Sequence, residues 1–293
     1  MSWRNRTVRA SAIAGLAFVL PAFILFIIFR FVPFIGGFTL AFAERTLGGE
    51  FTWVGMDNFE RLAADPLFWH SLRVTIAYTL IVVPLTLALA TGLALLVRRR
   101  FAGVDFFRAA FFMPVITSLV LAGIIFVWIF NAGGPVPRLM EALGLGGQSW
   151  ITDRLLALPA IALVAAWSAF GYYMLVILAR LNEIPREIEE AALVDRANAW
   201  ARFRYITLPE LRQVLFFLSV LSMVGSFQVF DAVYVMTQGG PVNATYTLGF
   251  MLYDQAFRFF DFGYASAVAV ALFVLVFAIT LIQRFLMGRE DKA

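Results

Sequence analysis

The chain has 293 residues, of which 62% are hydrophobic and only 14% are charged, whereas charged residues make up about a quarter of a typical soluble domain. The formal net charge of +4 is too small to indicate nucleic-acid binding, and the absence of cysteine excludes disulfides and thiolate sites. The only lysine, Lys292, cannot supply the phosphate-binding lysine of a Walker A loop. The composition therefore predicts an all-α, polytopic membrane protein, with any ATP chemistry on another subunit.

Six stretches are long and apolar enough to cross a bilayer, because a transmembrane helix needs roughly 20 mostly apolar residues. They cover residues 11–35, 71–97, 107–130, 156–180, 212–236 and 264–286. The first follows a basic tail, as a signal peptide does, but its apolar run is longer than the roughly 7–15 residues of a signal core. We therefore expect it to be retained as a helix, so that both termini lie on one side of the membrane.

The distribution of basic residues predicts the orientation. Sixteen lie in the N-terminal tail, the turn at 98–108, the segment 180–212 and the C-terminal tail, and six lie in the opposite loops. Because basic residues gather on the cytoplasmic side, both termini and the segment 180–212 are expected in the cytoplasm. This predicts a multi-pass protein of the cytoplasmic (inner) membrane.

The segment EIEEAALVDRANAWARFRYITLPE, residues 187–210, is too polar to cross a bilayer. We predict a helix from about 185 to 197, with Pro185 in its first position and Asn182 or Glu183 as the cap. A second helical turn over 199–205 is expected to end before Leu208-Pro209 resets the chain into the fifth span. Two short helices would form a projecting knob, although the same periodicity also fits an amphipathic hairpin lying on the membrane surface.

Spacing within this segment resembles a known motif. The segment resembles the EAA loop of permease subunits of ATP-binding-cassette (ABC) importers. The resemblance lies in Glu190-Ala191-Ala192, then Asp195, then Ile206-x-Leu208-Pro209. In that family the loop forms a coupling helix that docks into the ATPase subunit. The family usually has glycine after the aspartate, where this chain has Arg196. If that position needs a positive φ, a non-glycine residue costs about 1 kcal/mol, so we expect the bend to move to Asn198 or the first helix to extend.

Other stretches resemble the carbohydrate-uptake branch of this family, the maltose and glycerol-3-phosphate type. They are VGMDNF at 54–59, DPxFW at 65–69 and TQGGP at 237–241, so that the resemblance covers nearly the whole chain. It implies a type I importer permease with one transmembrane domain over 1–293 and a coupling loop at 182–211. The residues that the motif assigns to ATPase coupling are Glu190, Ala191, Ala192, Asp195, Leu208 and Pro209.

The resemblance also implies the partners. They are a second homologous permease subunit, two nucleotide-binding ATPase subunits and an extracytoplasmic solute-binding protein, with membrane lipid around them. No cofactor is expected in this chain, because ATP and Mg²⁺ would be bound by the ATPase subunits.

Polar residues inside spans are costly and usually face an interior cavity. A sugar offers hydroxyl groups and apolar C–H faces, which suit an aromatic ring beside hydroxyl, amide and carboxylate groups. By resemblance, the central site uses the fourth and fifth spans, and its candidate substrate residues are Trp167, Ser168, Tyr172, Ser226, Gln228 and Asp231. The alternatives are that the serines serve helix packing, that the tyrosines mark the membrane interface and that Asp231 is a solvated mouth residue. His70, at a span entrance, is expected to be structural.

Two other function classes fit the sequence less well. An enzyme acting on lipid-linked substrates needs a cluster of acids or histidines at one membrane face. The candidates here are Asp254 and Asp261, which are seven residues apart and have no histidine or Asp-rich motif near them. A proton-coupled carrier needs acids in the span centres, and these are missing. The sequence thus favours a non-enzymatic importer subunit for a sugar or oligosaccharide. Glycerol-3-phosphate or a related glycerol phosphodiester is the alternative, disfavoured because no basic residue lies inside the fourth or fifth span, apart from the arginines at their cytoplasmic ends.

Overall fold

The computed structural model describes residues 2–45, 51–99 and 101–288, and only the backbone of residues 2–13, 45 and 286–288. Arg100, Arg289 and Lys292, three of the basic residues used to predict the orientation, lie outside these ranges. Six helical stretches in the described part are long and apolar enough to cross a membrane, which confirms the predicted number of spans. They are Ala14–Leu40, Pro66–Arg98, Leu119–Ala142, Ala157–Glu183, Ala199–Phe227 and Phe262–Phe285.

The chain packs as two compact units, Met1–Ala64 with Leu252–Ala271 and Asp65–Met251 with Leu272–Ala293. The first unit contains α1 (Ser2–Phe26), a π-helical turn (Ile27–Phe31), α2 (Val32–Leu40), β1 (Ala43–Arg45), β2 (Phe51–Trp53) and α3 (Asp57–Ala64). It also includes the end of α13 (Leu248–Tyr253), a π-helical turn (Asp254–Arg258) and the start of α14 (Phe262–Gly288). The strands pair antiparallel, with Ala43 opposite Trp53.

The VGMDNF stretch forms the turn into α3. Gly55 has a φ of 63°, a left-handed conformation that favours glycine. The buried Asn58 amide donates hydrogen bonds to the carbonyl oxygens of Ala41 (3.0 Å) and Ala43 (3.2 Å). These bonds satisfy backbone acceptors between α2 and β1, so the asparagine has a structural role here.

The second unit contains α4 (Pro66–Arg98), α5 (Val104–Ile116), α6 (Leu119–Phe130), α7 (Pro135–Ala142) and α8 (Ala157–Glu183). It continues with α9 (Arg186–Val194), α10 (Ala199–Arg202), a π-helical turn (Phe203–Thr207), α11 (Leu208–Phe227) and α12 (Asp231–Met236). The DPxFW stretch starts α4, because Asp65 is its N-cap, accepting a hydrogen bond from the Leu67 amide (2.8 Å), and Pro66 fills the first turn.

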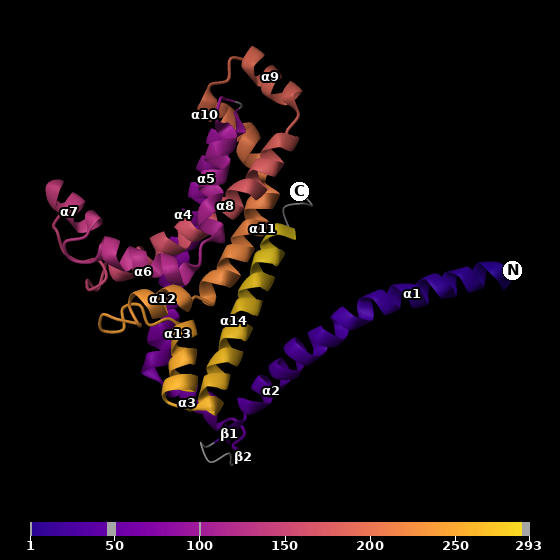
Figure 1. Cartoon of the computed structure of the whole chain (residues 1–293), viewed down its shortest axis with the longest axis vertical. Coiled ribbons are helices and arrows are strands. Elements are labelled where there is room, and N and C mark those ends of the chain that lie inside the picture. The colour runs from indigo at the N-terminus through magenta and orange to yellow at the C-terminus, as the bar shows by residue number, and fades with distance from the viewer. Residues whose placement is uncertain (1, 46–50, 100, 289–293) are drawn as a thin grey trace. The chain divides into compact units, whose positions relative to one another are not determined.

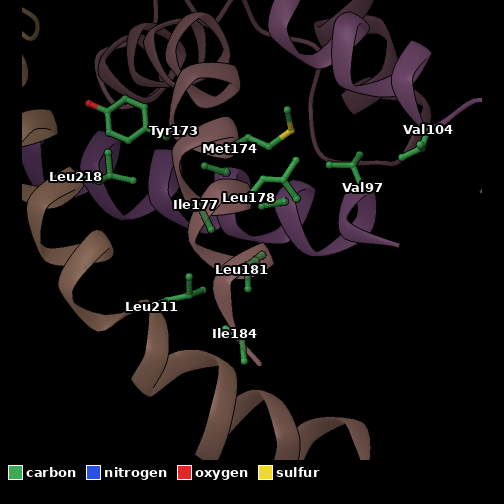
Figure 2. Close-up of a cluster of buried hydrophobic side chains, with 12 residues drawn as sticks. Val97, Val104, Tyr173, Met174, Ile177, Leu178, Leu181, Ile184, Leu211 and Leu218 are labelled. Carbon is green, nitrogen blue, oxygen red and sulfur yellow. The ribbon is translucent and has the colours of Figure 1, made fainter. Parts of the chain in front are cut away.

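The core of this unit lies where α4, α5, α8 and α11 run together (Figures 1 and 2). Fully buried Ala90 and Ala94 let α8 approach α4 closely, as small residues do in membrane helix packing. The larger buried side chains are Val97, Val104, Tyr173, Met174, Ile177, Leu178, Leu181, Ile184, Leu211 and Leu218, and Figure 2 shows them converging from these helices. The helices α8 and α11, which carry candidate substrate residues, therefore share one packed core.

The third span differs from its prediction. Residues 107–130 were expected to form one continuous helix, but Thr117 (ψ 134°) and Ser118 (ψ 126°) are extended and separate α5 from α6. Pro114 lies in the last turn of α5, and the Thr117 hydroxyl donates to the Met113 carbonyl (3.2 Å). A side-chain hydroxyl thus satisfies a backbone acceptor near the break, which makes the interruption tolerable in a membrane.

Candidate functional site

The helix α9 begins and ends at different residues from those predicted. Because α8 continues to Glu183, neither Asn182 nor Glu183 caps α9; Pro185 is its N-cap residue, with φ −58° and ψ 135°. Glu187 and Glu189 lie in the first turn, where the helix dipole favours negative charge. The helix then stops at Val194, three residues before the predicted end.

The end of α9 explains its length. Arg196 has a φ of 56°, its amide donates to the Leu193 carbonyl (3.0 Å), and the Ala197 amide donates to the Ala192 carbonyl (2.9 Å). These two bonds define a Schellman motif, the helix ending that normally has glycine at the left-handed position. The expectation that the bend would move to Asn198, or that the helix would extend, was wrong: Arg196 takes the glycine conformation, and Asn198 caps α10 by accepting from the Ala201 amide (2.8 Å).

The predicted reset at Leu208-Pro209 is also wrong. The helical backbone continues from α10 through the π-helical turn Phe203–Thr207 into α11, with helical dihedrals at Thr207 and Leu208. Proline lacks an N–H and its ring presses on the carbonyl four residues earlier, so the wider π turn that ends two residues before Pro209 accommodates it within a continuous helix. The fifth span is thereby joined directly to α10.

Ion pairs fix this segment to the spans. The Arg98 guanidinium, at the end of α4, pairs with Glu189 on α9. Arg180 on α8 donates to the Glu210 carboxylate (2.8 Å) and to the Glu210 carbonyl (3.1 Å) at the start of α11. The segment from α9 to α11 is therefore tied to α4 and α8.

A cavity of about 290 Å³ lies between α4, α8 and α11 at the point where the fifth span is interrupted. The helix α11 ends at Phe227, and Gln228–Phe230 separate it from α12, so the expectation of a continuous helix over 212–236 was wrong. The Thr247 hydroxyl donates to the Val229 carbonyl (3.1 Å), which satisfies one of the acceptors exposed by the break. The polar lining residues of the cavity are Tyr78, Thr86, Ser168, Tyr173, Ser222, Ser226, Gln228 and Asp231.

The comparisons with known proteins identify the family. A sequence profile described as binding-protein-dependent transport system inner membrane component matches residues 87–291. The chain belongs to this family. It is an integral membrane permease subunit of an ABC importer, and proteins of this kind are transport subunits rather than enzymes.

Several relatives of this permease match along nearly their whole length. The lactose transport system permease protein LacF of Rhizobium radiobacter is 34% identical, covering 99% of this chain and 98% of the relative. The arabinooligosaccharides transport system permease protein AraP of Bacillus subtilis (strain 168) is 33% identical, covering 98% and 92%. A crystal structure of a bacterial ABC transporter involved in alginate import superposes with a TM-score of 0.84 at 21% identity, covering 98% of this permease and 99% of that chain. This likeness confirms the predicted type I importer permease fold.

The structure places the six candidate coupling residues on the surface or partly buried. Glu190, Ala191 and Asp195 are exposed on α9 and in its C-cap, and Ala192 is half-buried. Beside them, the apolar side chains of Ile188, Leu193 and Val194 are 41%, 55% and 83% exposed. Leu208 is half-buried and Pro209 exposed at the start of α11. The helix therefore presents a mixed acidic and apolar surface outward.

The structure brings together four of the six candidate substrate residues. Ser168, Ser226, Gln228 and Asp231 line the cavity. Trp167 instead packs edge-on against Phe126, with ring centroids 5.1 Å apart, and Tyr172 is 43% exposed. Of the six candidate substrate residues, four therefore line the cavity, and the two aromatic residues Trp167 and Tyr172 lie outside the cavity lining.

Four polar lining residues were not among the candidates: Tyr78 and Thr86 on α4, Ser222 on α11, and Tyr173, which replaces its neighbour Tyr172. Sequence periodicity gave no reason to choose between Tyr172 and Tyr173, and only the packing of α4 against α8 brings Tyr78 to the cavity. Ser226 is 5% exposed; its hydroxyl donates to the Met223 carbonyl (2.8 Å) and lies 2.8 Å from the Thr79 hydroxyl. Its bonding therefore fits helix packing, the alternative raised for the serines.

The TQGGP stretch forms part of a compact loop after α12. Gly239 has a φ of 83°, and a Cβ there would collide with the rings of Tyr246 and Phe250. His70 Nε2 on α4 donates to the Asn243 carbonyl in this loop (2.9 Å). The histidine thus joins the start of α4 to the loop, which is the structural role expected.

The two aspartates considered as catalytic candidates for an enzyme, Asp254 and Asp261, both form ion pairs. Asp254 pairs with Arg258 (3.1 Å), and Asp261 pairs with Arg61 (2.6 Å), whose guanidinium also lies 4.1 Å above the Tyr264 ring. Both carboxylates are therefore held in ion pairs, as structural acids commonly are.

Proposed function

We propose that this permease is one of two homologous membrane-spanning subunits of an ATP-driven importer, in which α9 is the coupling helix. The observation that carries the proposal is the continuous helical path from the exposed segment to the cavity. The helix from Ala199 to Phe227 has 29 residues, a length of about 43 Å at the usual helical rise. Its far end is the break between α11 and α12 (Figure 1). The residues of this break line the cavity.

The mechanism follows from these connections. Closure of the ATPase subunits on ATP would move α9, whose acidic and apolar residues face outward. Only Ile184 and Pro185 separate α9 from α8, and the Schellman turn and α10 link it to α11. Because α8 and α11 both line the cavity, a displacement of α9 would shift two of its walls and expose the site alternately to the two sides.

The substrate in this proposal is a neutral sugar or oligosaccharide. The cavity combines tyrosine rings with hydroxyl and amide groups, and Asp231 is the one charged residue in its lining within the part of the chain that the structure describes. A carboxylate repels phosphorylated compounds, so glycerol-3-phosphate and its diesters are disfavoured. Relatives named for lactose, arabinooligosaccharides and trehalose/maltose support the sugar class.

The partners in this proposal are a second permease, two ATPase subunits that bind ATP and Mg²⁺, and an extracytoplasmic solute-binding protein. The family description names binding-protein dependence. A crystal structure of the bacterial alginate ABC transporter in complex with an alginate pentasaccharide-bound periplasmic protein has the same fold, with a TM-score of 0.83, and supports the binding-protein partner.

The proposed orientation places both termini and α9 in the cytoplasm. The chain contains no cysteine, so single cysteines can be introduced without background. We expect Glu187→Cys on α9 to react with an impermeant maleimide only in inside-out vesicles, and Ala142→Cys at the end of α7 only in right-side-out vesicles. The opposite labelling pattern would overturn the orientation.

The transport proposal is tested with the complete complex in proteoliposomes, using lactose, maltose, an arabinooligosaccharide and glycerol-3-phosphate as probes. We expect ATP-dependent uptake of at least one of the three sugars and none of glycerol-3-phosphate. Uptake of glycerol-3-phosphate alone would contradict the assignment of the cavity to neutral sugars.

A further inference from the structure

A second, larger cavity lies beside α9, away from the candidate substrate site. Its volume is about 940 Å³, and it lies between the end of α4, the start of α5, the end of α8 and the α10–α11 junction. Five arginines line it: Arg98, Arg99, Arg108, Arg186 and Arg202. Among the described residues Glu189 is the only acid in the lining, so these residues together carry a formal charge of +4.

The arginines exceed the carboxylates available to them. Glu189 pairs with Arg98, and Asp105 pairs with Arg108 (3.0 Å). Within the described residues, no carboxylate forms an ion pair with Arg99, Arg186 or Arg202, and the buried Nε of Arg108 has no hydrogen-bond acceptor. Several guanidinium groups facing one cavity repel one another unless an anion lies between them.

The other wall of the cavity is apolar. It is formed by Leu95, Ile184, Phe203 and Ile206. The cavity lies where α4 ends at Arg98, α5 begins at Val104 and α8 ends at Glu183. Because membrane-spanning helices commonly end near the lipid headgroups, we expect the cavity to lie at that depth. Nearby, Trp200 and Tyr205 are 69% and 76% exposed, as aromatic residues at a membrane interface are.

We propose that this cavity binds the phosphate group of an anionic phospholipid headgroup. Guanidinium groups form bidentate, charge-assisted hydrogen bonds to phosphate oxygens, and basic pockets between membrane helices bind such headgroups. The apolar wall accommodates the glycerol and the first acyl carbons, which free inorganic phosphate would leave unused. Since Arg186 and Glu189 belong to α9, a bound lipid contacts the helix that the proposed function assigns to coupling.

The test uses the full-length permease in mild detergent, titrated separately with phosphatidylglycerol, phosphatidylcholine and inorganic phosphate and read by native mass spectrometry. We expect saturable binding of phosphatidylglycerol that exceeds phosphatidylcholine binding and weakens with salt. Inorganic phosphate that displaces the lipid would identify free phosphate as a second source of the same chemistry. Equal binding of the two lipids would overturn the proposal.

The variants Arg99→Gln and Arg202→Gln test the site directly. Each basic residue near an anionic headgroup strengthens binding about fivefold, so the double variant is expected to bind phosphatidylglycerol about 25-fold more weakly. The double variant Arg138→Gln/Arg154→Gln, which changes two exposed arginines elsewhere, is the matched control and should bind like the parent. Unchanged lipid binding in R99Q/R202Q would overturn the proposal.

The lipid's contact with the coupling helix rests on the proposed function, so the two must be tested separately. A pull-down with the same variants, which measures how much ATPase subunit is recovered, makes this distinction. Loss of lipid with normal ATPase recovery supports the lipid site. Loss of the ATPase with normal lipid binding would show that these arginines serve the protein partner; the lipid site would then be refuted and the importer proposal would stand.

Discussion

At the scale of single residues, Arg196 is the clearest departure from local preference. It occupies the left-handed position of a Schellman motif that usually holds glycine, and its φ of 56° is disfavoured for a residue with a Cβ. The surrounding hydrogen bonds from Arg196 and Ala197 to α9 maintain this conformation. The turn therefore adopts the conformation that glycine usually provides, although the residue is arginine.

Replacing Arg196 by glycine is expected to stabilise the end of α9 by about 1 kcal/mol, because the cost of the left-handed conformation is removed. Hydrogen exchange of the α9 amides measures this local free energy of opening. Arg204→Gly is the matched control: Arg204 lies in the helical stretch, where glycine should destabilise by about 1 kcal/mol. Faster exchange in R196G than in the parent would contradict the assignment.

Ser226 and Gln228 are expected to differ in function although both line the cavity. The Ser226 hydroxyl is bonded to Met223 and Thr79, so Ser226→Ala should lower the free energy of unfolding by about 1 kcal/mol and leave the KM for uptake nearly unchanged. Gln228 is exposed at the break, so Gln228→Ala should raise KM about fivefold through loss of one substrate hydrogen bond. Uptake kinetics and thermal unfolding of both variants measure this; the reverse pattern would identify Ser226 as the ligand.

At the scale of helices, breaks and irregular turns determine where the functional residues lie. The π turns Ile27–Phe31 and Phe203–Thr207 each end two residues before a proline, Pro33 and Pro209, and keep the helix continuous past it. The break at Gln228–Phe230 instead ends the helix and opens the backbone toward the cavity. In a membrane, irregular backbone is tolerated where it lines a cavity or is packed in protein.

Helix packing makes a second prediction at this scale. A Cβ on Gly171 in α8 would collide with the Phe111 carbonyl of α5, so Gly171→Ala should force the two helices apart and cost about 1–3 kcal/mol. Gly92 in α4 has open space around it, so Gly92→Ala should be neutral or stabilising by up to about 1 kcal/mol. Thermal unfolding in detergent compares the two; equal effects would contradict the close approach of α5 and α8.

Sequence patterns predicted the helices well and their interruptions poorly. Hydrophobicity and length decide that a segment crosses the membrane, and these quantities can be counted along the chain. The break at Gln228–Phe230 depends on a tertiary partner, because the Thr247 hydroxyl satisfies a backbone acceptor freed at Val229. The cavity residues follow the same division. Ser168 and Gln228 could be predicted because they are polar residues in the fourth and fifth spans, whereas the position of Tyr78 depends on how α4 packs.

At the scale of the whole molecule, the permease has features of one part of an assembly. The apolar side chains of residues 14–40 are mostly exposed, with Phe18 at 88% and Phe29 at 70%, which fits contact with lipid or with another subunit. The segment α9 likewise exposes apolar and acidic groups together. These surfaces are consistent with the proposed second permease and ATPase subunits.

Asp195 provides the functional prediction at this scale. It lies exposed in the C-cap of α9, immediately before the Arg196 turn. Asp195→Ala is expected to lower substrate-stimulated ATPase activity and uptake of the assembled importer at least tenfold, or to weaken assembly to a similar degree. Parallel assays of complex yield, ATPase activity and uptake distinguish these outcomes, and values equal to the parent in all three would refute the coupling role.

The most direct test of the account is a pull-down of the tagged permease from membranes solubilised in mild detergent, with mass-spectrometric identification of the proteins recovered. We expect a second six-span permease and an ATPase subunit, with the ATPase lost from the double variant Glu190→Ala/Asp195→Ala. The matched variant Glu60→Ala/Glu141→Ala, which removes two carboxylates outside α9, should retain both partners. Recovery of the permease alone, or of the ATPase in equal amount with E190A/D195A, would contradict the assignment of α9 as the coupling helix.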